Sequence, residues 1–323
     1  MSRSPRSILV TGANGDISDA IGRIIAERWP ECALHGADAS GPWPGLGLFA
    51  QMHPLPLARD AAFLPALQTL QAQHGFDLII PVPEPELARL AEPAAQESGL
   101  PLLMNAPQTI TMGCDKFATA QWLQSHDIPA PATHLLELAN PQHLPLFVKP
   151  RFGYGSRDLA LIETTEALLA IQQTQRVPSV AQAWIPDSDG EFTCALLKVG
   201  EHTRRITLKR WLQGGLTGRA EVVDDPAINA YLDKILAALP DRNAVNVQLR
   251  IADGQPLAFE INPRFSSTAM MRHRLGFADV AWMIDYALNQ TPPPVYTPQP
   301  GARVFRLSRE VTAPPLSAAT TNP

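Results

Sequence analysis

The sequence predicts a mixed fold, in which a parallel α/β unit is followed by an α+β unit rich in antiparallel strands. Between residues 7 and 106, short apolar strands alternate with helices, as at residues 8–10 and 18–29. Strands separated by helices favour a parallel sheet that the helices wrap. From residue 191 onward strand signals dominate, and Asp253-Gly254 between two strand-like runs indicates an antiparallel hairpin.

The expected elements follow from hydrophobic periodicity and from breaks at Pro and Gly. In the first unit the expected strands are residues 8–10, 32–35 and 77–81, and the expected helices are residues 18–29, 63–73 and 84–97. In the second unit the expected helices are residues 115–125, 165–173, 226–238 and 279–288. Its expected strands are residues 146–149, 159–163, 180–185, 192–199, 204–209, 244–251, 256–261 and 304–307.

Length and composition limit the function classes. The 323 residues include 45% hydrophobic and 18% charged residues, an ordinary globular balance, and the chain is long enough for roughly two or three packed units. The formal net charge is −5 and no long run of Lys or Arg occurs. This argues against nucleic acid or a membrane surface as the main partner.

The cysteines and the N-terminal residues indicate an intracellular protein. Cys32, Cys114 and Cys194 are odd in number and widely separated, and no pair has metal-ligand spacing, so a reduced compartment fits best. The apolar run at residues 8–10 is too short for a signal peptide, and no later segment is long enough to span a bilayer. We therefore expect a cytoplasmic location.

The predicted hairpin brings polar side chains to one face. Glu260 and Asn262 are two positions apart, so both leave the same side of their strand. A three-residue loop at 253–255 would place Gln248 directly opposite Glu260. A carboxylate and two amides supply the oxygen ligands that Mg²⁺ prefers, and Arg264, on the same parity, could hold a phosphoryl group or a carboxylate. For the hairpin alone, a surface that faces water is the preferred interpretation.

A glycine-rich segment follows the expected strand that ends at Lys149. An ammonium group at this position can meet phosphate oxygens, and Gly153 and Gly155 permit close approach of the backbone. Successive N–H groups, together with the Ser156 hydroxyl, can cradle phosphates. Taken alone, the segment is better explained as a tight turn with a solvated Lys, and it lacks the Gly-Lys-Ser/Thr of a Walker A loop.

An extended segment at residues 180–185 leads into a loop and then to Glu191. Backbone groups of such a connector can face an adenine edge, with Ile185 against the ring. The Glu191 carboxylate can accept hydrogen bonds from ribose hydroxyls. By itself, the pattern is a strand, a loop and a surface Glu.

In their order and spacing, these features resemble the ATP-grasp superfamily, above all the ATP-binding halves of the carbamoyl phosphate synthase large subunit and related stand-alone ligases. The resemblance rests on Asp115-Lys116, residues 128–131, 148–151 and 182–185, Glu191, Gln248 and residues 260–264. It covers residues 107–290. It implies a two-lobed ATP-grasp domain, with a small lobe at 107–185 that carries the phosphate loop and a C-terminal lobe at 186–295 that carries the metal site. A Rossmann-like domain at 1–106 would precede it, and a terminal strand with a flexible tail, disordered from about Pro314, would follow at 296–323.

The resemblance implies a role for each matched residue. The implied ATP contacts are Lys116, Lys149, Gly153, Gly155, Ser156, Gln182, Ala183, Trp184, Ile185, Glu191 and Lys209, with Arg210 as the alternative to Lys209. Of these, Lys116 and Lys149 meet phosphates, and the glycine-rich loop closes over the triphosphate. Ala183 and Ile185 frame the adenine, and Glu191 meets the ribose. The implied ligands of Mg²⁺ (or Mn²⁺) are Gln248, Glu260 and Asn262, and the implied catalytic residues are Lys149 and Arg264. Asp158 departs from the family pattern, because a Gly is expected there.

The resemblance implies an ATP-dependent carboxylate–amine ligase. ATP would phosphorylate a small-molecule carboxylate to an acyl phosphate, and an amine would displace phosphate to form an amide, with release of ADP. The partners would be these small molecules, and a homodimer is among the assemblies common in such enzymes. The substrate pocket would lie between Glu84, Glu86 and residues 266–274, although acids at a helix N-terminus also suit its dipole. Arg272, His273 and Arg274 would bind a substrate carboxylate or form a solvated helix end.

Other interpretations remain open. One is a carbamoyl phosphate synthase-like kinase acting on a small carboxylate. Another is an NAD(P)-binding protein like the short-chain dehydrogenases, which residues 11–15 resemble, but none of the four tyrosines is followed four positions later by Lys. A non-enzymatic nucleotide-binding module is the third, and it would have little physical need to keep the lysine, the acid, the amide and the arginine together.

Overall fold

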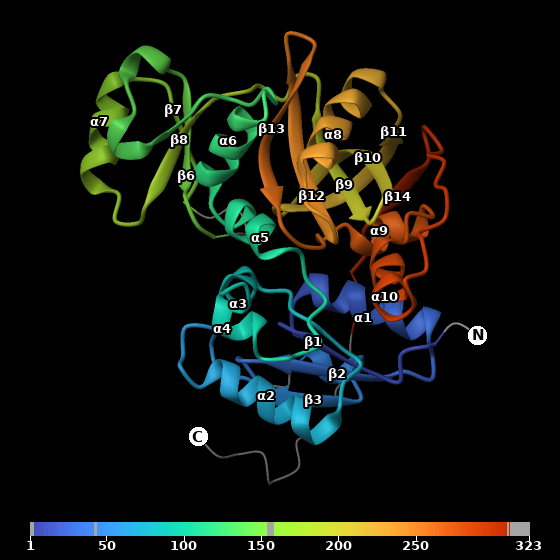
Figure 1. Cartoon of the computed structure of the whole chain (residues 1–323). Helices are drawn as coiled ribbons and strands as arrows, with labels where there is room; N and C mark the ends of the chain where they lie inside the picture. The colour runs from blue at the N-terminus through green and yellow to red at the C-terminus, as the bar shows by residue number, and fades with distance from the viewer. Residues whose placement is uncertain (1–2, 42–43, 154–157, 309, 311–323) are drawn as a thin grey trace.

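A computed structural model of the chain describes residues 3–41, 44–153, 158–308 and 310. Within these residues the chain forms one parallel sheet of four strands and two antiparallel sheets of four and six strands. Figure 1 shows the parallel sheet below the two antiparallel sheets. The predicted mixed fold, a parallel α/β unit followed by an α+β unit, is confirmed. The tail predicted from Pro314 lies outside the described residues.

The N-terminal sheet contains β1 (Ser7–Thr11), β2 (Ala33–Asp38), β3 (Gln51–Pro54) and β4 (Leu78–Ile80) in the order β3-β2-β1-β4. Helix α1 (Asp16–Arg28) packs on one face with Ile8 and Val10, and α2 (Phe63–His74) packs on the other face with Leu9. Burial of both faces explains why the first strand is entirely apolar at its centre. Strand β3 was not expected from the sequence, since it has only four residues and lies at the sheet edge.

The expected helix at 84–97 is in fact two helices, α3 (Glu84–Leu90) and α4 (Pro93–Gln96). The break has a local cause, because Pro93 disfavours the helical conformation in the residue before it. Glu92 is extended, with ψ 149°, and occupies the N-cap position of the second helix.

The smaller antiparallel sheet contains β5 (Thr133–Leu135), β6 (Leu146–Pro150), β7 (Ala160–Ile162) and β8 (Ser179–Ala183) in the order β5-β8-β6-β7. Helix α7 (Thr165–Thr174) packs on it through Leu168. Short 3₁₀ turns at Leu136–Leu138 and Pro141–His143 connect β5 to β6. Two helices precede this sheet, α5 (Pro107–Gly113), which was not expected, and α6 (Lys116–Ser125).

The larger sheet contains β9 (Glu191–Val199), β10 (His202–Gln213), β11 (Leu216–Val223), β12 (Asn243–Ala252), β13 (Gln255–Asn262) and β14 (Arg303–Phe305). Their order is β13-β12-β9-β10-β11-β14. Side chains alternate along β9, so that Phe192 and Cys194 face α8 (Pro226–Ala238) while Ala195 and Leu197 face the opposite side. Strand β11 was not expected from the sequence.

Hydrophobic clusters cross the predicted domain boundaries. Met112 and Leu123, from the segment assigned to the small lobe, pack in the same cluster as α8 and the large sheet. On the other face, the large sheet shares a cluster with α1 and with α10 (Asp279–Asn289), which follows the short, unexpected α9 (Ala269–Arg274). The large sheet is therefore packed directly against the N-terminal unit. No helix of the described residues is long and apolar enough to cross a membrane.

The hairpin between β12 and β13 differs from the expected one in its loop. Only Asp253 and Gly254 form the turn, with φ 49° and 74°, because Ala252 pairs with Gln255. The three-residue loop was therefore wrong. The pairing of Gln248 with Glu260 is nevertheless present, because a bulge at residue 259 adds one residue to β13. Positive φ at both turn positions suits the tight hairpins that Asp-Gly favours.

Candidate functional site

A cavity of about 620 Å³ lies between the two antiparallel sheets, and Asp16 and Ile17 at the start of α1 also line it. The structure brings most of the predicted site residues to its walls, although their contacts with ATP and metal stay predictions. The predicted residues that line it are Lys116, Lys149, Gly153, Gln182, Ala183, Trp184, Ile185, Glu191, Gln248, Glu260, Asn262 and Arg264. Gly155 and Ser156 lie outside the described residues.

Lys149 forms hydrogen bonds to both antiparallel sheets. Its Nζ donates hydrogen bonds to Oε1 of Gln182 on β8 and to the carbonyl oxygen of Phe259 on β13, both at 2.9 Å. Phe259 is the bulged residue, so the irregularity in β13 supplies the carbonyl that receives the ammonium group. Burial lowers the pKa of Lys149 to about 8, and Glu260 opposes this shift. At neutral pH the ammonium form still dominates.

The start of α6 is tied to the end of β6. Asp115 caps the helix by accepting hydrogen bonds from the N–H groups of Phe117 and Ala118. The same carboxylate pairs with the Arg151 guanidinium at 2.6 Å. Lys116 Nζ donates to the carbonyl oxygen of Gly153 at 2.8 Å. These contacts place the Lys116 ammonium at the glycine-rich segment, beside the cavity.

The connector after β8 is held by main-chain contacts. The N–H of Ala183 donates to Ala132 at 2.8 Å, and that of Trp184 donates to Pro145 at 3.1 Å. The carbonyl oxygen of Ile185 accepts a hydrogen bond from Arg250 Nη1 at 2.6 Å. The segment therefore has a fixed path along the cavity wall.

Two guanidinium groups hold the Glu191 carboxylate. Arg210 Nε donates to Oε1 at 2.8 Å, and Arg250 Nη2 donates to Oε2 at 2.7 Å. Burial raises the pKa of Glu191, but the two guanidiniums outweigh it and hold the pKa below its usual value. Arg210 also donates to Gln248 Oε1 at 2.8 Å, so it links the predicted ribose acceptor to a predicted metal ligand.

Gln248, Glu260 and Asn262 project from adjacent strands into the cavity, with Gln248 and Glu260 in register. No described side chain forms a hydrogen bond or ion pair with the Glu260 carboxylate. Asn262 is 5% exposed, and its buried Nδ2 has no partner among the described residues. A carboxylate and two amide oxygens are a donor set that suits Mg²⁺, so the residues fit the predicted metal.

Arg264 connects the cavity to the N-terminal unit. Its Nη2 donates to Glu84 Oε1 at 2.8 Å, and both side chains are mostly buried. Burial raises the pKa of Glu84, and the Arg264 charge opposes this. Nearby, burial raises the pKa of Glu86 to about 7 while a hydrogen bond with Thr11 lowers it. Of the two acids predicted near a substrate pocket, Glu84 thus contacts the arginine directly.

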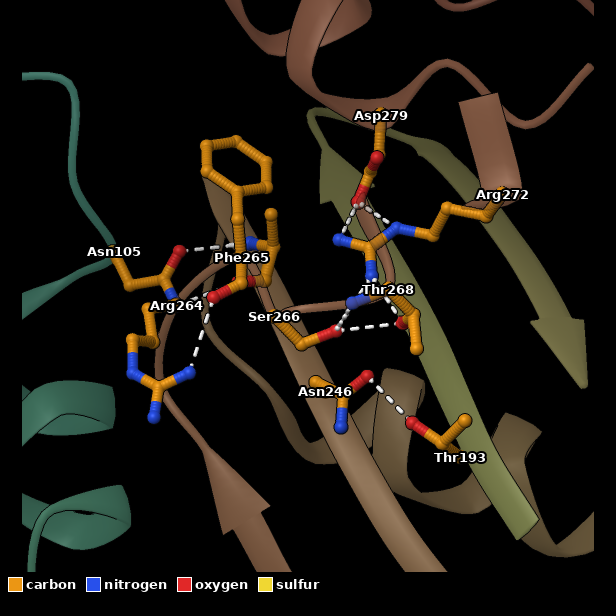
Figure 2. Close-up of polar contacts among 10 residues, drawn as sticks. Asn105, Thr193, Asn246, Arg264, Phe265, Ser266, Thr268, Arg272 and Asp279 are labelled. Atoms are coloured by element: carbon orange, nitrogen blue, oxygen red, sulfur yellow. Dashed lines mark hydrogen bonds and ion pairs between the residues drawn. The ribbon is translucent and has the colours of Figure 1, made fainter. Parts of the chain in front are cut away.

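The loop after Arg264 is braced by a buried arginine. Arg272 is 1% exposed, and it donates to Asp279 at 2.9 Å and to the Ser266 hydroxyl at 2.8 Å. Figure 2 shows this guanidinium between Asp279 and the paired hydroxyls of Ser266 and Thr268. Neither expectation for Arg272, a substrate contact or a solvated helix end, describes it. Its role in the structure is to position the loop.

Lys209 does not belong to the described cavity wall. Its Nζ lies 5.9 Å from the centre of the Phe192 ring, on the face of the sheet that α8 covers. Because side chains alternate along β10, its neighbour Arg210 faces the cavity instead. The choice of Lys209 over Arg210 was therefore wrong, because the Lys209 side chain points away from the cavity. The pairing of β10 with β9 distinguishes the two residues, because it places Arg210 opposite Glu191.

Arg250 was not singled out from the sequence at all. It lies two residues after Gln248, on the same face of β12, and its guanidinium is 4.8 Å from the centre of the Trp184 ring. Thr193 and Asn246, joined by a hydrogen bond of 3.0 Å, complete the same wall (Figure 2). The parity used for Gln248 would have indicated Asn246 and Arg250 as well.

Comparisons with known proteins agree with the fold. Residues 114–268 match the ATP-grasp domain family. An L-amino acid ligase from Bacillus licheniformis superposes with a TM-score of 0.71 at 20% identity, over 89% of this chain and 75% of that one. An N5-carboxyaminoimidazole synthetase from Staphylococcus aureus, in complex with ADP, gives 0.71 at 15% identity, over 90% and 78%. A biotin carboxylase from Campylobacter jejuni gives 0.69 at 14% identity, over 93% and 74%. No curated protein sequence matches the chain.

Proposed function

Because the chain belongs to the ATP-grasp superfamily through its domain at residues 114–268, we propose that it is an ATP-dependent ligase that joins a carboxylate to an amine. The observation that carries this proposal is the meeting of Lys149, Glu260 and Arg264 in one cavity. A buried cation, an unpaired carboxylate and an arginine anchored from outside the domain are suited to transfer of a phosphoryl group. The solved structures of similar fold include a ligase that acts on amino acids, in support of this reaction class.

Different walls of the cavity would contact different parts of ATP. On the small-sheet side, Lys149 and Lys116 would neutralise phosphate oxygens. Residues 182–185 would frame the adenine, and Glu191 would accept from the ribose hydroxyls with lone pairs that its two arginines leave free. Glu260, Gln248 and Asn262 would hold Mg²⁺, which draws charge away from the phosphate oxygens when it is bound.

The reaction balances with ADP and phosphate as products. A carboxylate oxygen of the substrate attacks the γ-phosphorus of ATP, the bond to the β–γ bridging oxygen breaks, and ADP leaves. The amine nitrogen then attacks the carbonyl carbon and phosphate leaves with the former carboxylate oxygen, while the ammonium proton passes to solvent or a nearby base. Arg264 would stabilise charge on the transferring group, and its ion pair with Glu84 supports this role by holding the guanidinium in place.

Calorimetry of ATP binding tests the site first. We expect the native chain to bind ATP in the presence of Mg²⁺, and Glu260→Ala to bind it at least about tenfold more weakly with Mg²⁺ and little differently without it. Circular dichroism and thermal unfolding serve to establish that both proteins are folded. Binding that is indifferent to Mg²⁺ and to Glu260 would overturn the assignment of the metal residues.

A panel of carboxylates and amines then tests the reaction. Release of ADP that requires both an acid and an amine supports the ligase, whereas release that requires the acid alone indicates a carboxylate kinase. An ¹⁸O-labelled carboxylate sharpens the test. Attack by the carboxylate on the γ-phosphorus transfers one labelled oxygen to the phosphate product, and unlabelled phosphate contradicts the acyl phosphate.

A further inference from the structure

Three histidines meet on the N-terminal unit, away from the cavity. His35 lies on β2, His53 on the edge strand β3, and His74 is the last residue of α2. They are separated by 18 and 21 positions in sequence, yet one ring nitrogen from each lies within 4.8 Å of the others. Figure 1 shows α2 on the side of the parallel sheet that is turned away from the antiparallel sheets. The cluster therefore has no part in the candidate ATP site.

The three rings are closely packed with their nitrogens turned toward one another. His35 Nδ1 and His53 Nε2 are 3.0 Å apart, and the His74 ring centre lies 4.7 Å from that of His53. Phe76 closes one side, with its ring centre 5.1 Å from that of His35. Tetrahedral Zn²⁺ with bonds of about 2.0–2.1 Å needs nitrogens about 3.4 Å apart. His74 is exposed, so rotation about its own torsions can bring its ring to that distance.

The surroundings of the three rings favour a bound cation. His35 is buried and His53 is half-buried, with ring nitrogens that face one another. His74 stands at the C-terminal end of a twelve-residue helix, where the helix dipole favours positive charge. Imidazole ligands suit Zn²⁺, and three of them leave a fourth position for water.

We propose that His35, His53 and His74 form a Zn²⁺ site that ties the edge strand and the end of α2 to the centre of the N-terminal sheet. β3 pairs only with β2 among the described strands, and three histidines from three elements would cross-link this edge. The role is structural, because the described cavity residues come from the other side of the sheet. The competing interpretation is a stack of rings held by the hydrogen bond between His35 and His53.

Zn²⁺ titration of the untagged, chelator-treated chain separates these interpretations. With Mg²⁺ in excess, we expect one equivalent of Zn²⁺ to bind and to raise the melting temperature, and Co²⁺ to give the visible absorption of a tetrahedral site. His74→Ala and His53→Ala should each weaken Zn²⁺ binding about 100-fold or more, since a lost ligand should cost no less than a lost supporting contact. His74 is exposed, so this variant should fold normally.

Two control variants decide where the metal binds. His134 stacks on His143 at 4.9 Å, a pair with only two rings, so His134→Ala should leave Zn²⁺ affinity unchanged. Glu260→Gln removes the carboxylate from the cavity and should also leave it unchanged. The proposal is overturned if the chain binds no Zn²⁺, if His74→Ala binds it as tightly as the native chain, or if the binding disappears in Glu260→Gln.

Discussion

The two walls of the cavity are built in different ways. On the large sheet, Glu191, Gln248 and Glu260 stand on long paired strands, and Arg210 and Arg250 link the first two of them to their surroundings. On the small-sheet side, Lys116 reaches the cavity from the start of a helix and contacts the single carbonyl of Gly153. The first wall is ordered by its own side chains, whereas the second combines Lys149 on strand β6 with loop segments. We infer that the large-sheet wall is preformed for its ligand.

The largest expected effect separates the two lysines. Lys149→Met should lower turnover by about 10²–10³-fold, because it removes a buried charge that water screens weakly. Lys116→Met removes a partly exposed charge and should cost only about tenfold. Steady-state kinetics with saturating acid and amine provide the measurement. Equal losses in the two variants would show that burial does not distinguish the two lysines of the small-sheet wall.

The next effect concerns stability and the arginine pair around Glu191. Glu191→Gln leaves the largely buried Arg210 and Arg250 without a counter-charge and should lower the free energy of unfolding by about 2–3 kcal/mol. The control is Glu221→Gln, whose partner Arg303 is 63% exposed, and it should cost less than about 1 kcal/mol. Denaturant unfolding measures both. A cost for Glu191→Gln no greater than for the control contradicts a preformed large-sheet wall.

The pH dependence of ATP binding gives a smaller effect with a definite sign. Lys149 loses its proton as pH rises through about 8, so affinity for ATP should fall up to about tenfold between pH 7 and 9. Stability should move the other way. The unfolded chain, in which this lysine has its usual pKa of 10.5, binds more protons between about 8 and 10.5, so this group makes unfolding less favourable as pH rises.

Lys149→Met tests whether both slopes come from one group. It should remove the fall in ATP affinity and the matching rise in unfolding free energy over this range. If either slope persists in the variant, another group is responsible for it. Cys114 does not titrate in this pH range, since burial raises its pKa to about 12.

The same difference between the walls explains what the sequence could predict. Period-two alternation placed Gln248 opposite Glu260, although the loop length assumed for it was wrong and the bulge at Phe259 made up the difference. Alternation alone could not choose between Lys209 and Arg210, because that choice needs the register of β10 against β9. For residues on strands, the sequence thus predicts which side chains share a face, whereas choosing the face that lines the cavity needs the register between strands.

Contacts between distant segments were beyond local patterns. The ion pair of Arg264 with Glu84 joins positions 180 apart in sequence, and each residue had been placed near the pocket for a separate reason. The histidine cluster was missed because its members come from three elements with no motif spacing, and one of them is on the unexpected strand β3. Short edge strands carry too few residues to reveal a period.

The smallest expected effect tests the loop-dependent wall at Asp158, where a Gly was expected. Its φ of 53° lies in the left-handed region, which Gly adopts without cost and Asp tolerates better than Ala. Asp158 in place of the expected Gly therefore restricts the backbone more than Gly would, but the conformation at this position is one that Gly also adopts. Asp158→Gly should change stability by less than about 0.5 kcal/mol, and it should be more stable than Asp158→Ala by about 1 kcal/mol.

Ala170, in the middle of α7, provides the matched control with the opposite sign. There Ala170→Gly should destabilise the chain by about 0.5–1 kcal/mol, because Gly loses more backbone freedom in a helix. Thermal unfolding of the three variants gives the comparison. If Gly were worse than Ala at both positions, the left-handed conformation at 158 would be wrong. If Gly is better only at 158, Asp158 is a tolerated substitute, and the affinity of Asp158→Gly for ATP should stay within about twofold of native.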